Sequence, residues 1–332
     1  MSELERRRGH SARRLEELGM RLAAAEREFG SRACIYVTGS YGRGEASGSS
    51  DVDAFLVAGP QQADSSPSFG RLDSMCLLAA LIRACRETGF PEFSNDGEYL
   101  AYYDVGKLCK NLGQPNDDSS NTLTARLLML LEGAPILGKQ VFEAGIEEVL
   151  RSYWRDYQDH SESFVPAFLI NDILRLWRTF CVNYEARTAD VPPEKKAKRA
   201  LKNFKLKHSR LLTCFSALAM LTATHARKGT VSLADAALMC RMAPTDRIRW
   251  LSTQPDFHHA CPVAQHILES YESFLLVCAR PEQDLISDFQ RPEFKRERMQ
   301  EARSLSMKMF DLLRVLGQKG DEPTEVYRVI VV

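Results

Sequence analysis

The stretch that decides the fold runs from Ile35 to Val57 and reads IYVTGSYGRGEASGSSDVDAFLV. It begins and ends with apolar runs that are rich in strand-forming residues, and a segment rich in Gly and Ser lies between them. The first run leads directly into Gly39-Ser40, where a helix is expected to begin. The pattern predicts two strands, with Gly39 and Ser40 at the end of the first one.

Two aspartates enter the second strand two residues apart. Because side chains in a strand alternate between its faces, this spacing directs the carboxylates of Asp51 and Asp53 to the same side. Two neighbouring carboxylates beside the apolar Val52 are costly unless a cation neutralises them. Mg²⁺ suits such a pair, since it binds one or two carboxylates and completes its octahedral shell with water and phosphate oxygens.

The glycines upstream suit a phosphate. Glycine at a strand-to-helix turn lets backbone N–H groups approach a phosphate closely, and the hydroxyl of Ser40 adds a donor. Arg43 is expected to add positive charge there. A phosphate-binding turn beside metal-binding carboxylates indicates nucleotide chemistry, and a Gly/Ser hairpin loop with a chance acidic pair is the alternative.

Over Ile35 to Val57 the sequence resembles the DNA polymerase beta-like nucleotidyltransferase superfamily. The signature of that superfamily is an apolar strand, Gly-Ser, a Gly-containing turn and Asp-x-Asp on the next strand, and the run from Gly39 to Glu45 is most similar to its PII uridylyltransferase-like bacterial branch. The resemblance implies transfer of a nucleoside monophosphate from a nucleoside triphosphate such as ATP to a hydroxyl. Asp51 and Asp53 would bind two Mg²⁺ ions, with Mn²⁺ as an alternative, and Gly39 and Ser40 would hold the β- and γ-phosphates.

The superfamily normally adds a third catalytic and metal-binding carboxylate on a later strand. Asp96 is the first candidate for it and Glu98 the second. Both residues also fit the simpler role of turn residues at the start of a strand. Some relatives lack a clear third carboxylate, so catalysis with two carboxylates stays open.

A basic segment lies at 195–210, with eight basic side chains in sixteen positions. Lys202, Lys205 and Ser209 recur at helical spacing and share one face. In the superfamily a helix of the second domain commonly presents Lys and Ser to the triphosphate, so these three residues are expected substrate ligands. A solvated basic face and a local track for a polyanionic acceptor, such as a nucleic acid, are the alternatives.

Along the rest of the chain, helices are expected at 3–29 and 71–88, and a third strand at 98–103. From Thr122 to Leu316 the sequence has an almost continuous helical period, broken near Gly138 and at prolines 192–193, 244, 262 and 281. The fold prediction is therefore α+β. A small mixed-sheet nucleotidyltransferase (palm-like) domain occupies 1–140, a larger all-helical domain occupies 141–320, and residues 321–332 form a tail that is a strand candidate.

Composition narrows the functional class. The 332 residues include 44 Lys+Arg and 44 Asp+Glu, a formal net charge of zero, which weighs against a protein that coats nucleic acid non-specifically. The nine cysteines are scattered singly, as is typical of reduced cytosolic proteins. No apolar run reaches the roughly 18 residues of a membrane span. We therefore expect a cytoplasmic protein without a membrane partner.

The acceptor is the most open part of the prediction. A tyrosine, serine or threonine hydroxyl of a protein is one candidate, and Tyr327 in the tail is a hypothetical acceptor in cis or from a neighbouring subunit. Template-independent synthesis of an oligonucleotide or a nucleotide second messenger in antiphage signalling is an alternative by fold-level analogy. A non-catalytic nucleotide-binding module is the alternative from another class. Base, sugar, acceptor and oligomeric state are left open by the sequence.

Overall fold

The computed structural model describes residues 1–60, 69–93, 97, 100–188, 195–319 and 322–332. The chain divides into two compact units, Met1–Arg155 and Asp156–Val332. The division falls later than the expected boundary near residue 140, because helix α8 (Lys139–Tyr153) packs against strand β1 (Ala33–Thr38) of the first unit. The second unit is built of helices apart from one two-stranded hairpin among its described residues.

The first unit contains a four-stranded mixed sheet with the strand order β3-β2-β1-β4. β1 pairs antiparallel with both β2 (Asp53–Ala58) and β4 (Ala134–Leu137), whereas β2 pairs parallel with β3 (Tyr102–Asp104). The expected α+β class with a small mixed sheet is confirmed. β4 was not expected, since it is a four-residue edge strand with a proline, within a region of helical period.

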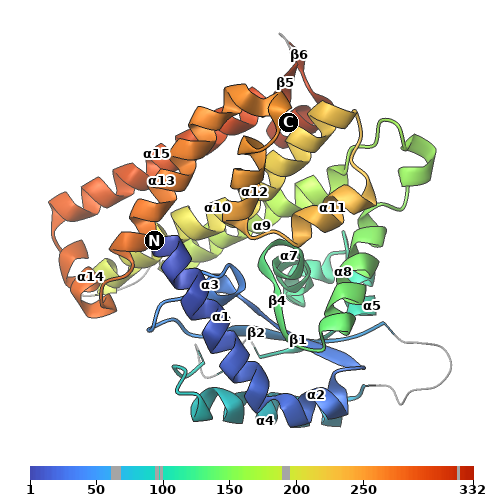
Figure 1. The fold of residues 1–332 in the computed structure, drawn as a ribbon, viewed down its shortest axis with the longest axis vertical. Coiled ribbons are helices and arrows are strands. Elements are labelled where there is room, and N and C mark those ends of the chain that lie inside the picture. The colour runs from blue at the N-terminus through green and yellow to red at the C-terminus, as the bar shows by residue number, and fades with distance from the viewer. Residues whose placement is uncertain (61–68, 94–96, 98–99, 189–194, 320–321) are drawn as a thin grey trace. The chain divides into compact units, whose positions relative to one another are not determined.

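The central strand β1 is buried on both faces. Ile35 and Val37 belong to the core that the sheet shares with α1 (Glu3–Arg21), α2 (Ala23–Phe29) and α4 (Arg71–Glu87). Tyr36 points to the other face, where its ring stacks on Phe55 at 5.3 Å and its hydroxyl donates to the carbonyl of Ala125 in α7 (Thr122–Glu132). Helices cover both faces of the sheet (Figure 1), so β1 and β2 form a rigid base for the segment between them.

The other elements of the first unit are short or differ slightly from expectation. The expected helix 3–29 is divided at Leu22, and the third strand begins at Tyr102 rather than at residue 98, which lies outside the described residues. The helix expected at 71–88 is confirmed by α4. The remaining helices are α3 (Gly39–Gly42), α5 (Val105–Lys110) and α6 (Asn116–Ser119).

The second unit is a helical bundle around the long helix α10 (Lys196–Lys228), which packs against most of its other helices. Leu201, Phe204 and His208 recur at helical spacing along α10 and are buried, so they form an apolar stripe that packs into the bundle. Prolines 244 and 262 lie in the first turns of α12 and α13, and Pro281 is the N-cap of α14. The other α-helices of this unit, and the 3₁₀ helices among its described residues, are α9 (Ala167–Thr188), α11 (Leu233–Cys240), α12 (Pro244–Ser252), α13 (Cys261–Val277), α14 (Glu282–Phe289), α15 (Pro292–Gly317), α16 (Glu325–Val331), η2 (Tyr157–His160) and η4 (Pro255–Ala260).

The C-terminal tail forms a helix instead of the strand we expected. Two-residue strands β5 (Gln318–Lys319) and β6 (Glu322–Pro323) form a hairpin, and α16 follows it. The Thr324 hydroxyl caps α16 by accepting from the Tyr327 amide at 3.4 Å. The β-branched residues there favour a strand, but the cap and the complete burial of Val326 against the bundle outweigh that preference.

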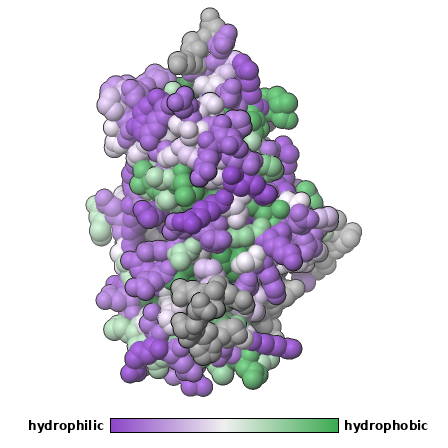
Figure 2. Space-filling view, turned by 90° about the vertical axis from the view of Figure 1, so that its right-hand side faces the viewer, coloured by the Kyte–Doolittle hydropathy of each residue, from purple (hydrophilic) through white to green (hydrophobic). Residues whose placement is uncertain are grey.

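The surface is mixed in character. The face drawn in Figure 2 is largely hydrophilic, interrupted by several separate hydrophobic patches. Among the described helices, none is both long enough and apolar enough to cross a membrane.

Candidate active site

The antiparallel register of β1 and β2 brings the two parts of the motif together. Thr38, the last residue of β1, lies opposite Asp53, the first residue of β2. The short helix α3 begins immediately after Thr38 with Gly39 and Ser40. The Gly-Ser turn and the Asp-x-Asp segment therefore share one end of the sheet, although the ten residues 41–50 separate Ser40 from Asp51 in the sequence.

Asp51 and Asp53 flank a buried residue. Val52 is buried, Asp51 is half-buried and Asp53 is exposed. This alternation matches the period of two on which the predicted same-side placement of the carboxylates was based, although the strand itself begins only at Asp53. Two accessible carboxylates suit Mg²⁺, which needs only one or two protein carboxylates when phosphate oxygens and water complete its shell.

The backbone of Gly39 lies close against the side chain of Asp53. Its φ is +65°, a left-handed conformation that favours glycine, and a Cβ atom at this position would lie 2.6 Å from Asp53 Oδ2. Gly42 is equally constrained, because a Cβ atom there would overlap the carbonyl oxygens of Glu132 and Val37. The glycines thus allow the turn to lie directly against the acidic pair and against the end of α7.

The backbone amide of Gly39 already has a protein partner. It donates to Glu132 Oε1 at 2.8 Å, and Glu132 is the last residue of α7. Arg43 Nη1 donates to Glu132 Oε2 at 2.9 Å, and Arg43 Nε donates to Glu45 Oε2 at 2.9 Å. All three of these charged side chains are buried. Arg43 therefore lies between two carboxylates, whereas the sequence predicted a phosphate contact for it.

Neither candidate for the third carboxylate can be placed, because Asp96 and Glu98 lie outside the described residues. On the described part of β3, Asp104 lies opposite Ala58, at the end of β2 remote from Asp53. Its side chain caps α5 by accepting from the Lys107 amide at 3.1 Å. Across the described residues, no group of three or more His, Cys, Asp or Glu side chains is placed to hold a metal ion.

The three predicted ligands on α10 belong to the second unit. Lys202 is exposed, and Lys205 Nζ lies 3.4 Å from Glu282 Oε2 of α14. The hydroxyl of Ser209 accepts from that of Tyr271 at 3.4 Å. The helical spacing on one side of α10 is as expected, and Glu282 and Tyr271 are partners that the sequence did not reveal.

Tyr327, the hypothetical acceptor, lies on α16 rather than on an extended tail. Its ring packs so closely on Gly317 of α15 that a Cβ atom at position 317 would overlap it. The side chain is half-buried. Reaching another site would require this helix to leave the bundle.

Sequence reasoning missed Glu132, Glu45 and Arg7. Glu132 ends the apolar run of α7 and is almost fully buried, so a charged residue at the end of a buried helix was its only sequence signal. Arg7 Nη1 donates to the carbonyl of Glu45 at 3.0 Å. These contacts join residues 38 to 93 positions apart, and no local pattern encodes them.

Comparison with known proteins finds no relative of this chain. No protein-family model, curated protein or solved structure matches the chain. The function of the chain is therefore inferred from its own residues and their geometry.

Proposed function

We propose that the chain is a metal-dependent nucleotidyltransferase with its active site at the Gly39–Gly42 turn and the Asp51–Asp53 pair. The observation that carries the proposal is the opposition of Thr38 and Asp53, with the Gly39 backbone lying against the Asp53 carboxylate. This arrangement gives one end of the sheet accessible carboxylates for a divalent cation and a glycine turn that a phosphate can approach. The palm-like identity of the sheet is part of the same proposal.

In the proposed reaction, an acceptor hydroxyl oxygen forms a bond to the α-phosphorus of a nucleoside triphosphate. The bond from that phosphorus to the bridging oxygen breaks, pyrophosphate leaves, and the hydroxyl proton passes to water or a carboxylate. Asp51 and Asp53 hold the divalent cations, and the turn at Gly39 and Ser40 orients the β- and γ-phosphates. When bound, the cations neutralise charge on the attacking and leaving oxygens. Protein hydroxyls and nucleotide hydroxyls both suit this chemistry as acceptors.

The contacts of Gly39 and Arg43 favour a second candidate, a nucleotide-binding module without catalysis. The Gly39 amide is engaged by Glu132, and Arg43 is neutralised by Glu132 and Glu45. A phosphate would therefore have to compete with Glu132 for the Gly39 amide. Such a module would bind a nucleoside triphosphate but release no pyrophosphate.

A label-transfer assay separates the two candidates. The protein is incubated with each α-³²P-labelled ribo- and deoxynucleoside triphosphate in the presence of Mg²⁺ or Mn²⁺, and products are resolved on protein and nucleic-acid gels. Catalysis predicts label transfer that is lost in Asp51→Asn and in Asp53→Asn and retained in Asp159→Asn, which alters an exposed aspartate elsewhere. Binding of triphosphate without transfer in the wild type supports the module, and absence of both contradicts the proposal.

A further inference from the structure

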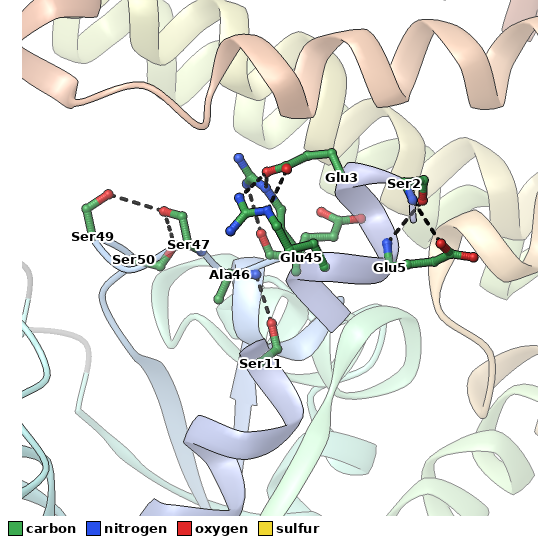
Figure 3. Close-up of polar contacts among 11 residues, drawn as sticks. Ser2, Glu3, Glu5, Ser11, Glu45, Ala46, Ser47, Ser49 and Ser50 are labelled. Atoms are coloured by element: carbon green, nitrogen blue, oxygen red, sulfur yellow. Dashed lines mark hydrogen bonds and ion pairs between the residues drawn. The ribbon is translucent and has the colours of Figure 1, made fainter. Parts of the chain in front are cut away.

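The N-terminal helix α1 makes a row of contacts with the segment that leads to Asp51. Arg7 Nη1 donates to the Glu45 carbonyl at 3.0 Å, and the Ser11 hydroxyl accepts from the Ala46 amide at 3.0 Å. Positions 7 and 11 share one face of a helix, so the consecutive residues Glu45 and Ala46 are tied to a single helix face. Figure 3 shows Ser11 and Ala46 joined in this way, with Glu45 and Glu3 nearby.

These contacts are buried and continuous with the candidate active site. Arg7 is 4% exposed and Ser11 is 1% exposed. Glu3 Oε1 accepts from Arg7 Nε at 2.7 Å and so fixes the guanidinium that reaches Glu45. The Glu45 side chain in turn holds Arg43, which holds Glu132 against the Gly39 amide. One chain of polar contacts therefore runs from α1 to the phosphate-binding turn.

The same segment leads to the acidic pair within a few residues. Ser47 and Ser50 close a turn, in which the Ser50 amide donates to the Ser47 carbonyl at 3.1 Å and the Ser50 hydroxyl accepts from the Ser47 amide at 3.0 Å. Asp51 follows directly, and the buried Val52 fixes the next position. A segment of this Gly- and Ser-rich composition has little apolar surface to hold it in place, so its conformation depends on such polar contacts.

We infer that Arg7 and Ser11 of α1 are positioning residues for the candidate active site, holding the segment 44–50 so that Asp51 and the Gly39 turn keep their geometry. This inference rests on the proposed function for its catalytic consequence. The holding itself is a property of the protein without ligand and is measured separately. Metal and nucleotide sites lose affinity when their supporting contacts are removed, because the ligands must then be ordered at the moment of binding.

The chain supplies a matched control in Arg6. Arg6 and Arg7 are adjacent arginines that both pair with Glu3. Arg6 is exposed, and its side chain pairs with Glu3 within α1, whereas Arg7 also reaches Glu45. Arg6→Ala and Arg7→Ala therefore remove the same charge and a similar ion pair, and the contact to the segment distinguishes them. Ser11→Ala removes a single hydroxyl with little change in volume, so it tests the neighbouring contact, to the Ala46 amide, with a small risk to folding.

Hydrogen exchange of the unliganded protein is the first measurement. Ser11→Ala and Arg7→Ala are each expected to increase the exchange rate of amides in 44–52 by about fivefold to tenfold, because each variant loses one hydrogen bond to the segment. Arg6→Ala should leave the exchange rate unchanged. The second measurement is Mn²⁺ binding by electron paramagnetic resonance, followed by label transfer. We expect Ser11→Ala to weaken Mn²⁺ binding and to lower kcat about tenfold with little change in KM for the triphosphate. Arg7→Lys, which keeps the charge but lacks the fork that spans Glu3 and Glu45, should not restore the wild-type values.

Two results overturn the inference. Exchange in 44–52 that is unchanged in both Ser11→Ala and Arg7→Ala, or raised equally by Arg6→Ala, shows that α1 does not hold the segment. Faster exchange with wild-type Mn²⁺ binding shows that the held segment does not position the acidic pair. A wild type that binds Mn²⁺ but transfers no label contradicts catalysis alone, because the exchange and Mn²⁺ data still decide the positioning role.

Discussion

Gly39 and Asp53 lie in direct contact, so that a Cβ atom on residue 39 would be 2.6 Å from Asp53 Oδ2. The contact joins the two halves of the motif across the β1–β2 hairpin, since Thr38 and Asp53 are register partners. Any side chain at position 39 must displace the carboxylate that we propose as a metal ligand. Position 39 therefore couples the backbone of the turn to the geometry of the acidic pair.

Gly39→Ala is expected to abolish Mn²⁺ and nucleotide binding and to destabilise the first unit by about 1 to 3 kcal/mol. The left-handed backbone of residue 39 disfavours alanine, and the added methyl group displaces Asp53. Gly89→Ala, in the same unit but outside the candidate site, is the matched control. Its φ is +69° and no heavy atom lies within 4 Å of a Cβ there, so this variant carries the backbone strain without the clash.

Urea unfolding and Mn²⁺ titration of both variants separate the two effects. Similar losses of stability with loss of binding only in Gly39→Ala would support the coupling. Equal losses of Mn²⁺ binding in the two variants would mean that general destabilisation of the first unit, rather than displacement of Asp53, accounts for the defect.

Local sequence patterns predicted the hairpin well. The strands from Ala33 and Asp53, the turn at Gly39 and the alternation around Val52 all depend on neighbouring residues, and each agrees with the structure. The apolar stripe of α10 was predictable for the same reason, since helical period is a local property.

Long-range contacts could not be predicted from the sequence. Arg43 appeared as a phosphate ligand because its partners Glu132 and Glu45 are selected by the tertiary fold, and Glu132 is 89 positions away. The strand β4 was not predicted because four residues are too few to show an alternating pattern. The helix α16 was not predicted because the packing of Val326 overrides the β propensity of its residues. Whether Asp96 or Glu98 acts as a third carboxylate stays a prediction, since neither residue is described.

Glu282 is expected to oppose triphosphate binding if Lys205 is a phosphate ligand. Its carboxylate lies 3.4 Å from Lys205 Nζ and 3.6 Å from Lys198 Nζ, and all three side chains are substantially exposed. Glu282→Gln should therefore change stability by less than about 0.5 kcal/mol and strengthen binding of Mg²⁺·ATP about twofold to fivefold. Calorimetric titration measures this change, with Glu293→Gln, an exposed glutamate in the first turn of α15, as the control of equal charge. Identical affinities in Glu282→Gln and the wild type would leave Lys205 as part of a solvated basic face.

Asp117 and Arg126 form a fully buried ion pair whose disruption should be severe. Arg126 Nη2 lies 2.8 Å from Asp117 Oδ2, and both side chains are 0% exposed. Burial acts to lower the pKa of Arg126, but hydrogen bonds and charge from Asp117 and Tyr153 raise it above its usual value. Asp117→Asn leaves a buried cation without its counter-charge and should cost about 3 to 5 kcal/mol in urea unfolding. Glu147→Gln, which disrupts the exposed pair with Arg151, should cost less than about 1 kcal/mol. Comparable costs for the two variants would show that water reaches Arg126.

His208 should make the stability of the second unit depend on pH. Its ring is 1% exposed, stacks on Phe274 with centroids 4.4 Å apart and hydrogen-bonds through Nδ1 to the Phe204 carbonyl at 2.8 Å. Burial, the largest cause, lowers the pKa of His208 from 6.5 to about 4, and the charge of Arg298 acts in the same direction. Because the folded pKa lies below the unfolded one, the unfolded state binds more protons between these values. The free energy of unfolding is therefore highest above pH 6.5 and falls as the pH drops toward 4, by about 3 kcal/mol in total for this residue.

Urea unfolding between pH 5 and 7 measures this slope above the range in which most carboxylates titrate. His208→Phe keeps an aromatic ring against Phe274 and removes the titrating group, so it should flatten the slope. Some slope should remain, because burial also lowers the pKa of His225. His266→Gln, which alters an exposed histidine of α13, should retain the full wild-type slope. A slope in His208→Phe equal to that of the wild type would mean that the buried imidazole is protonated at little cost, with water or a carboxylate reaching it in the folded state.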